Sequence, residues 1–147
     1  MAQTFAAKVN AWVQAVPERQ AAVFKGAVQK VVSAAQTPVG AGGNMPIRDG
    51  FLRASVAATL TGAPPPMTYK PKGAAQYAYN PAEVALVIAS ADVSDTILLA
   101  WTANYARHVH WGAQGRAPQP FLSLAAQRWP QFVAEAAAEA QASTDSR

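Results

Sequence analysis

Two histidines are the residues of this 147-residue chain whose type and spacing could most readily do chemistry. His108 and His110 lie two positions apart in the stretch "YARHVHWG". On a β-strand, residues two apart point to the same side, and a histidine pair completed by carboxylates is a known metal-binding arrangement. Asp92 and Asp95 are the acidic residues nearest to the pair in the sequence. One interpretation is therefore a small metal-dependent hydrolase with His and carboxylate ligands.

A structural role for the two histidines is the interpretation that we favour, because the sequence fixes no further ligand beside them. Asp92 and Asp95 fall in a predicted turn, and nothing in the pattern folds that turn back onto the imidazoles. Histidines in such a segment are more often partly exposed side chains that hydrogen-bond to the backbone. The chain has no cysteine, which excludes disulfides, thiol nucleophiles and zinc–thiolate sites. We predict no metal ion and no cofactor.

Other catalytic patterns are missing from the sequence. The "GAGG" segment at residues 40–43 lacks the Lys-Ser/Thr that follows in a phosphate-binding loop, and it departs from the dinucleotide-binding fingerprint. Ser55 and Ser123 have no nucleophile elbow of small residues around them. We therefore predict that the chain is not an enzyme.

The charge balance leaves a basic nucleic-acid-binding domain open as a second alternative. Twelve Lys and Arg stand against eight Asp and Glu, which gives a formal net charge of +4. A positive balance can indicate a nucleic-acid partner. The basic residues are spread along the sequence, however, and they rarely adjoin an aromatic residue that could stack on a base. We expect most of them to form solvated surface.

Length and hydropathy predict one soluble domain over residues 1–147. A chain of this size buries a single core but not two. No window of about 18 uninterrupted apolar residues is present, as a membrane-spanning helix would need. The N-terminus also lacks the basic-then-apolar pattern of a secretory signal, so we expect the chain not to be exported.

Helical periodicity dominates the two ends of the sequence. Apolar residues recur at three- and four-residue steps near the N-terminus: Phe5, Val9, Trp12, Val16, Phe24, Val28, Val31 and Ala35. This spacing predicts a long amphipathic helix, kinked or broken near Pro17, whose longer half runs from Glu18 to Gln36. A C-terminal helix is predicted from Phe121 onward, with Pro130 as the point of a kink, and residues 143–147 are expected to fray.

The middle of the chain predicts strands. Apolar and polar residues alternate in "LRASVAATLTG" (52–62), which is typical of a half-buried strand. The β-branched run at 83–90 and the run at 96–101 are predicted to form a hairpin. The expected fold class is α+β, with a small antiparallel sheet packed against the N-terminal and C-terminal helices. Such a sheet has unpaired edges, which loops or another subunit must cover.

Two long loops and four core anchors complete the prediction. Residues 37–50 are rich in glycine, and residues 62–82 hold five of the eleven prolines, so neither segment continues a helix or a tight hairpin. The side chains expected to anchor the core are Phe24, Leu52, Phe121 and Trp129.

Two blocks of the sequence resemble a known family. The stretch "AQTPVGAGGNMPIRDGFLRASV" (35–56) is similar to the helix end, loop and first strand of the head-tail joining or tail-completion (neck) proteins of long-tailed phages. The stretch "LAWTANYARHVHWGAQGRAPQPFL" (99–122) resembles a second block of that family, and the two blocks have the family's order. The chain departs from the family at residues 110–113, where His-Trp-Gly-Ala replaces the common Glu-Tyr-Gly-Thr, and at Pro130.

The resemblance implies a virion structural protein without enzymatic activity, assembled in the host cytoplasm. It implies a homo-oligomeric ring that contacts neighbouring connector and tail proteins and joins the DNA-filled head to the tail, with DNA only passing through the channel. A ring requires each subunit to offer two different surfaces. The loop at 62–82 is one candidate surface, and the segment from Tyr105 to Phe121 becomes a shaped turn. The side chains expected to contact neighbours are Tyr69, Tyr77, Tyr79, Trp111 and Arg116.

Overall fold

A computed structural model describes residues 4–145 of the chain. The elements follow in the order α1 (Phe5–Gln14), α2 (Pro17–Gln36), the 3-10 turn η1 (Val39–Ala41), α3 (Phe51–Ala54), β1 (Val56–Thr59), α4 (Pro81–Ser90), β2 (Leu98–Trp101), α5 (Ala106–Trp111), α6 (Phe121–Ala126) and α7 (Trp129–Asp145). The fold class is α+β, as predicted, with a two-stranded antiparallel sheet beside the long helices. No helix within residues 4–145 is long and apolar enough to cross a membrane.

The long helices break where the sequence predicts. Pro17 is the first residue of α2 and Pro130 the second residue of α7, positions where proline is tolerated because the first N–H groups of a helix have no intrahelical partner. Each proline therefore starts a new helix. The C-terminal helix extends to Asp145, and the expected fraying of residues 143–147 stays a prediction, since residues 146–147 lie outside the described part.

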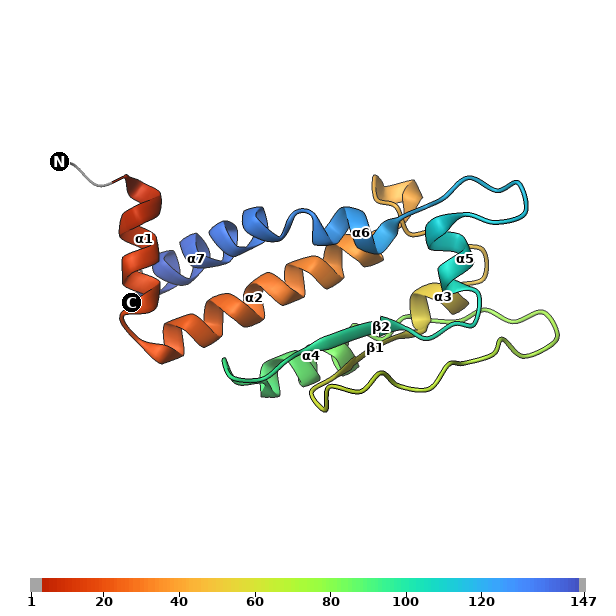
Figure 1. Cartoon of the computed structure of the whole chain (residues 1–147), viewed down its shortest axis with the longest axis horizontal. Coiled ribbons are helices and arrows are strands. Elements are labelled where there is room, and N and C mark those ends of the chain that lie inside the picture. The colour runs from red at the N-terminus through yellow and green to blue at the C-terminus, as the bar shows by residue number, and fades with distance from the viewer. Residues whose placement is uncertain (1–3, 146–147) are drawn as a thin grey trace.

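Helices α2 and α7 form the long axis of an elongated molecule (Figure 1). They lie side by side and run in opposite directions, and α1 packs across their far end. The sheet and α4 lie against the other side of α2, while α3 and α5 sit at the opposite end from α1. The molecule thus has one end made of helices and another made of short elements and loops.

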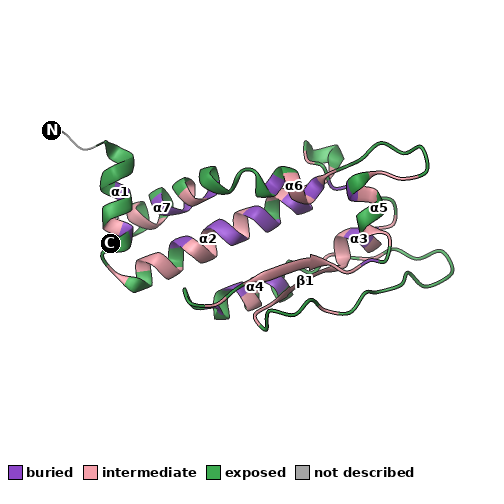
Figure 2. Cartoon of the chain, viewed as in Figure 1, coloured by how far each residue is buried: buried purple, intermediate pink, exposed green. Residues whose placement is uncertain are grey.

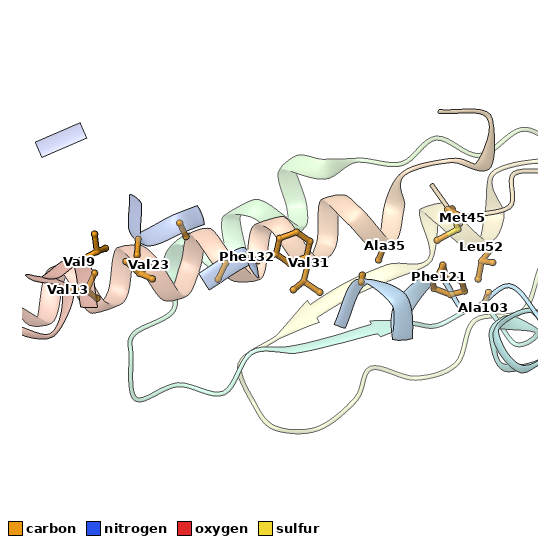
Figure 3. Close-up of a cluster of buried hydrophobic side chains, with 14 residues drawn as sticks. Val9, Val13, Val23, Val31, Ala35, Met45, Leu52, Ala103, Phe121 and Phe132 are labelled. Carbon is orange, nitrogen blue, oxygen red and sulfur yellow. The ribbon is translucent and has the colours of Figure 1, made fainter. Parts of the chain in front are cut away.

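Two clusters of buried side chains form the core, and both use α2 (Figure 2). The larger one extends from Val9 and Val13 of α1, past Phe132 of α7, to Phe121 at the loop-rich end (Figure 3). The smaller one joins α2 to α4 through four residues: Val28, Val32, Val84 and Ile88. Helix α2 therefore buries two faces, which explains its dense run of valine and alanine.

Two of the four expected anchors are fully buried. Leu52 is 4% exposed and Phe121 is 3% exposed. Phe24 is partly buried against the smaller cluster. Trp129 is 38% exposed, so its prediction as a core anchor is wrong. The apolar spacing predicts one continuous helix from Phe121, but α6 ends at Ala126 and α7 begins at Trp129, which changes the face that Trp129 presents.

The predicted strands are only partly correct. Strands β1 and β2 pair with each other, with Val56 opposite Trp101 and Thr59 opposite Leu98. The residues just before β1 are helical (α3), and residues 83–90 belong to helix α4, so the predicted hairpin over 83–101 is wrong. The sheet has two strands, and each strand has one edge without a strand partner among the described residues.

Helix α4 forms because its capping signals outweigh its β-branched composition. Asn80 is the N-cap, and its side-chain oxygen accepts a hydrogen bond from the Ala82 N–H at 3.1 Å. Pro81 occupies the first turn, where its fixed φ favours a helix. Val84 and Ile88, four residues apart, are both buried against α2, which is the spacing of a helix and not of a strand.

A buried glutamine ties the sheet to the end of α2. Gln36 is 2% exposed, and its side chain accepts a hydrogen bond from Trp101 Nε1 at 2.9 Å. Its Nε2 donates to the Arg53 carbonyl oxygen at 2.8 Å, and Arg53 Nε donates back to the Gln36 carbonyl oxygen at 3.0 Å. These bonds satisfy the buried amide and fix α2, α3 and β2 together, which gives the loop-rich end a rigid base.

Both long loops are present, and the second forms an extended arm, defined here as residues 60–80 (Figure 1). The arm is anchored beside β2, where the Thr68 N–H donates to the Thr102 carbonyl oxygen at 2.7 Å. It is anchored again on its return, where the Tyr77 N–H donates to the Asp49 carbonyl oxygen at 2.8 Å. Residues 71–76, at its tip, are exposed and project past α3 and α5.

Candidate functional site

An open cleft of about 920 Å³ lies at the loop-rich end of the molecule, among α3, α5, the arm and the loop after α5. Its apolar lining includes Leu52, Val109 and Ala117. The charged and titratable groups that line it are Arg48, Asp49, Lys70, Tyr105, His108 and Arg116. The cleft therefore combines an apolar wall with a predominantly cationic rim.

The fold concentrates positive charge at this end. The segments 44–54, 66–80 and 103–119 hold six of the twelve Lys and Arg, namely Arg48, Arg53, Lys70, Lys72, Arg107 and Arg116. The same segments hold one acidic residue, Asp49, out of eight. The basic residues look scattered along the sequence because they come from three separate segments, and only the fold brings them together.

The single acidic group of the cleft is already paired. Asp49 forms an ion pair with Lys70 of the arm, and its carboxylate accepts a hydrogen bond from the Phe51 N–H at 3.1 Å. The hydrogen bond from Lys70, and then that from Phe51, lower the pKa of Asp49 below its ordinary value. The pKa of Tyr105 is raised, first by burial and then by the nearby Asp49 charge. The carboxylate therefore offsets Lys70, whereas Arg48 and Arg116 on the rim form no ion pair with any acidic side chain of residues 4–145.

Two glycines permit the backbone path around the cleft. Gly50 has φ +86°, and a Cβ atom there would lie 2.2 Å from the Tyr77 carbonyl oxygen. The arm can return against α3 only because Gly50 has no side chain. Gly112 has φ +84°, and its Cβ would lie 2.9 Å from the Arg116 carbonyl oxygen. Gly112 thus permits a tight backbone path within the segment 105–121 that was predicted to be a shaped turn, although residues 106–111 of that segment are helical.

The two histidines do not form a pair. They lie on helix α5, where residues two apart point to different sides, so the strand geometry behind the metal hypothesis is wrong. His108 is exposed and lines the cleft, whereas His110 is buried at 8% exposure. Within residues 4–145, no group of three or more His, Cys, Asp or Glu side chains is arranged to hold a metal ion.

His110 has a structural environment. Its Nε2 accepts a hydrogen bond from the Ser123 N–H at 3.1 Å and lies 3.0 Å from the Ser123 hydroxyl oxygen. Its ring also packs edge-on against Phe121, with 5.5 Å between the centroids. Burial lowers the pKa of His110. The expected backbone hydrogen bond is confirmed for this residue, but the expected partial exposure is wrong, and the imidazole connects α5 to α6.

The five expected contact residues fall into two groups. Tyr69 and Trp111 are 72% and 66% exposed, and Arg116 is exposed on the rim of the cleft. Tyr77 is partly buried with its ring edge-on to that of Phe51, and Tyr79 is partly buried under the Arg53 guanidinium. These last two rings pack against their own chain, which leaves less of their surface for a partner. The sequence alone does not mark Arg48 or Lys70 as site residues, because their proximity depends on contacts between distant segments.

Comparison with known proteins finds no family model, no curated protein and no solved structure that matches this chain.

Proposed function

We propose that this chain is a structural protein of the phage neck, a ring-forming subunit that joins the DNA-filled head to the tail. The observation that carries the proposal is the junction of the two blocks that resemble the neck family. Residues 35–56 and 99–122 are held together by the Trp101–Gln36 hydrogen bond. Arg48 and Leu52 from the first block and Arg116 from the second line the same cleft. The blocks therefore form one surface, as expected if they serve one purpose.

Exposed apolar side chains at this end support an assembly role. Met67 and Tyr69 on the arm are 59% and 72% exposed, Trp111 at the end of α5 is 66% exposed, and Ile47 beside the cleft is 48% exposed. Aromatic residues and Met are enriched in protein interfaces relative to the rest of a protein surface. A subunit that is buried between neighbours in a particle would cover them.

A nucleic-acid-binding domain is the second candidate, and the cationic end favours it. Phosphate groups bind to clusters of Lys and Arg, and such binding weakens steeply as salt rises. The apolar wall of the cleft fits a protein partner better, because a nucleic-acid backbone offers little apolar surface to bury there.

Deletion of the coding sequence from its genome tests the proposal. We expect electron microscopy of the resulting lysate to show filled heads and separate tails, and we expect a plasmid copy of the wild-type chain to restore joined particles. Joined, infectious particles in the absence of the chain would refute the neck role.

Paired substitutions then test whether the loop-rich end is the contact surface. The variant Tyr69→Ser/Trp111→Ser should keep its melting temperature, since exposed substitutions usually change stability by less than about 0.5 kcal/mol, but it should fail to restore joining. Phe5→Ser is the matched control, because Phe5 is 73% exposed but lies on α1 at the other end. Equal restoration by both variants would exclude Tyr69 and Trp111 as contacts.

A further inference from the structure

A second exposed surface lies on α4 and the turn that follows it. Leu86 is 72% exposed and Val93 is 40% exposed, so both present apolar side-chain surface to solvent in the described part of the chain. Three of the eight acidic residues lie within three sequence positions of one or the other: Glu83, Asp92 and Asp95. We call these five residues the acidic ridge. Helix α4 runs away from the cationic end, so the ridge and the cleft lie apart along the long axis (Figure 1).

Local hydrogen bonds hold the tip of the ridge in one shape. The Asp95 carboxylate accepts a hydrogen bond from the Asp92 N–H at 2.7 Å, and the Asp95 N–H donates to the Asp92 carbonyl oxygen at 3.0 Å. The Asp92 carboxylate accepts from the Val93 N–H at 2.7 Å. A segment that is already ordered loses little entropy when it binds. Val93 is therefore presented on a preformed turn between two carboxylates.

The ridge and the cleft have complementary chemistry. The cleft offers an apolar wall inside a rim of Arg48 and Arg116, and the ridge offers apolar side chains flanked by carboxylates. We infer that the cleft of one copy of the chain binds the acidic ridge of the next copy. This inference rests on the proposed ring, because it names the two surfaces through which its subunits would meet.

The geometry of this contact suits a ring. It joins two different surfaces of identical chains, so it is heterologous, and contacts of this kind close into rings when the rotation between copies permits. The charges steer the copies into a head-to-tail arrangement, because two cationic ends or two ridges repel each other. Leu86 and Val93 would be covered in every copy.

Cysteine cross-linking tests the contact directly, because the chain has no cysteine of its own. One sample carries Ala117→Cys, at an exposed position in the lining of the cleft, and a second carries Ser94→Cys, at an exposed position in the turn of the ridge. Ala134→Cys, exposed on α7, is the matched control. Mixed under mild oxidation, the cleft and ridge variants should form a heterodimeric disulfide much faster than the cleft and control variants do.

Charge reversal on each side separates a specific contact from random collision. Arg48→Glu/Arg116→Glu on the Ala117→Cys chain should slow cross-linking by at least about tenfold, since like charges then face each other. Glu83→Lys/Asp92→Lys on the Ser94→Cys chain should restore most of the rate. Circular dichroism and melting temperature confirm that each variant is folded. Equal rates for the ridge and control variants, or no rescue by the second reversal, would overturn the inference.

A short DNA duplex added to the same mixture decides between a protein and a nucleic-acid occupant. The inference expects the duplex to leave the cross-linking rate nearly unchanged at physiological salt. If the duplex binds in a salt-sensitive way that needs Arg48 and Arg116, and if it abolishes the cross-link, then the cleft is a nucleic-acid site instead. The deletion experiment is independent of this result. If deletion blocks joining but the cysteines do not link, only the head-to-tail contact is wrong, whereas joining without the chain removes the neck role itself.

Discussion

Truncation of Phe121 to alanine should destabilise the chain more than any other single truncation proposed for it. The ring is 3% exposed and begins α6, at the junction of the core with the loop-rich end. It packs edge-on against Trp101, with 5.4 Å between the centroids, and against His110 at 5.5 Å. Both neighbours hold further hydrogen bonds, so they cannot move freely into the space that the ring vacates.

The expected loss follows from burial and from the cavity left behind. Truncation of a buried phenylalanine costs about 3–5 kcal/mol, and we expect the upper half of that range because the surrounding side chains are tethered. Each edge-on aromatic pair adds about 0.5–1.5 kcal/mol beyond its buried area. A domain of this size loses about 2–4 °C of melting temperature per kcal/mol, so Phe121→Ala should melt about 8–20 °C lower than the wild type.

Trp129→Ala is the matched control for this prediction. Trp129 lies on the same C-terminal segment and is the larger ring, but it is 38% exposed. Its truncation should therefore cost less than about half as much. Urea unfolding followed by circular dichroism measures both losses at constant pH. If Trp129→Ala is the more damaging change, or if Phe121→Ala leaves the transition unmoved, the described core is wrong.

Three further changes test the surroundings of the cleft. Gly50→Ala should lower the melting temperature measurably, because the residue has φ +86° and its new Cβ would meet the Tyr77 carbonyl oxygen; an unchanged melting curve would exclude this close approach. Acidification from neutral pH should destabilise the wild type as the pH falls below about 6.5. The reason is that burial lowers the pKa of His110, so the folded chain binds a proton there less readily than the unfolded chain does. A His110→Gln variant should lose this component of the pH dependence. Asp49→Asn should flatten the acid limb of the curve of stability against pH. The lowered pKa of Asp49 stabilises the fold at pH values above 3.8, the ordinary pKa of the group, and this stabilisation is lost as the pH falls through the pKa of the folded state. An unaltered acid limb would show that the pairing with Lys70 contributes nothing.

Local signals predicted the N-terminal and C-terminal helices well. Pro17 and Pro130 mark helix starts because proline acts on its own backbone and on the preceding turn, whatever the rest of the chain does. The burial of Leu52 and Phe121 also followed from their apolar periodicity. Such features depend on neighbours within a few residues.

The errors arose where two local signals favoured different secondary structures, or where a break between two helices changed the direction in which a side chain points. Residues 83–90 combine β-branched side chains with an Asn-Pro cap, and burial of Val84 and Ile88 against α2 decides for the helix. Trp129 was misplaced because a two-residue break between α6 and α7 shifts the helical phase. The sequence contained the Asn80–Pro81 signal that would have corrected the first error.

The candidate site was the least predictable part, because it is made by tertiary contacts. Arg48, Lys70 and Arg116 lie more than twenty residues apart in the sequence, and each looks like an ordinary solvated side chain there. The arm, the loop before α3 and the loop after α5 bring them to one cleft. The exposure of Leu86 was equally hard to predict, since the predicted strand would have buried this side chain and the helix leaves it exposed.

Joining in vitro is the most direct test of the central proposal. Filled heads and free tails would be purified from a lysate that lacks the chain and mixed with the purified protein. We predict that infectious, joined particles appear in proportion to the added wild-type chain, and that Tyr69→Ser/Trp111→Ser adds few. Heads and tails that join equally well without the protein, or that never join when it is supplied, would contradict the proposed role.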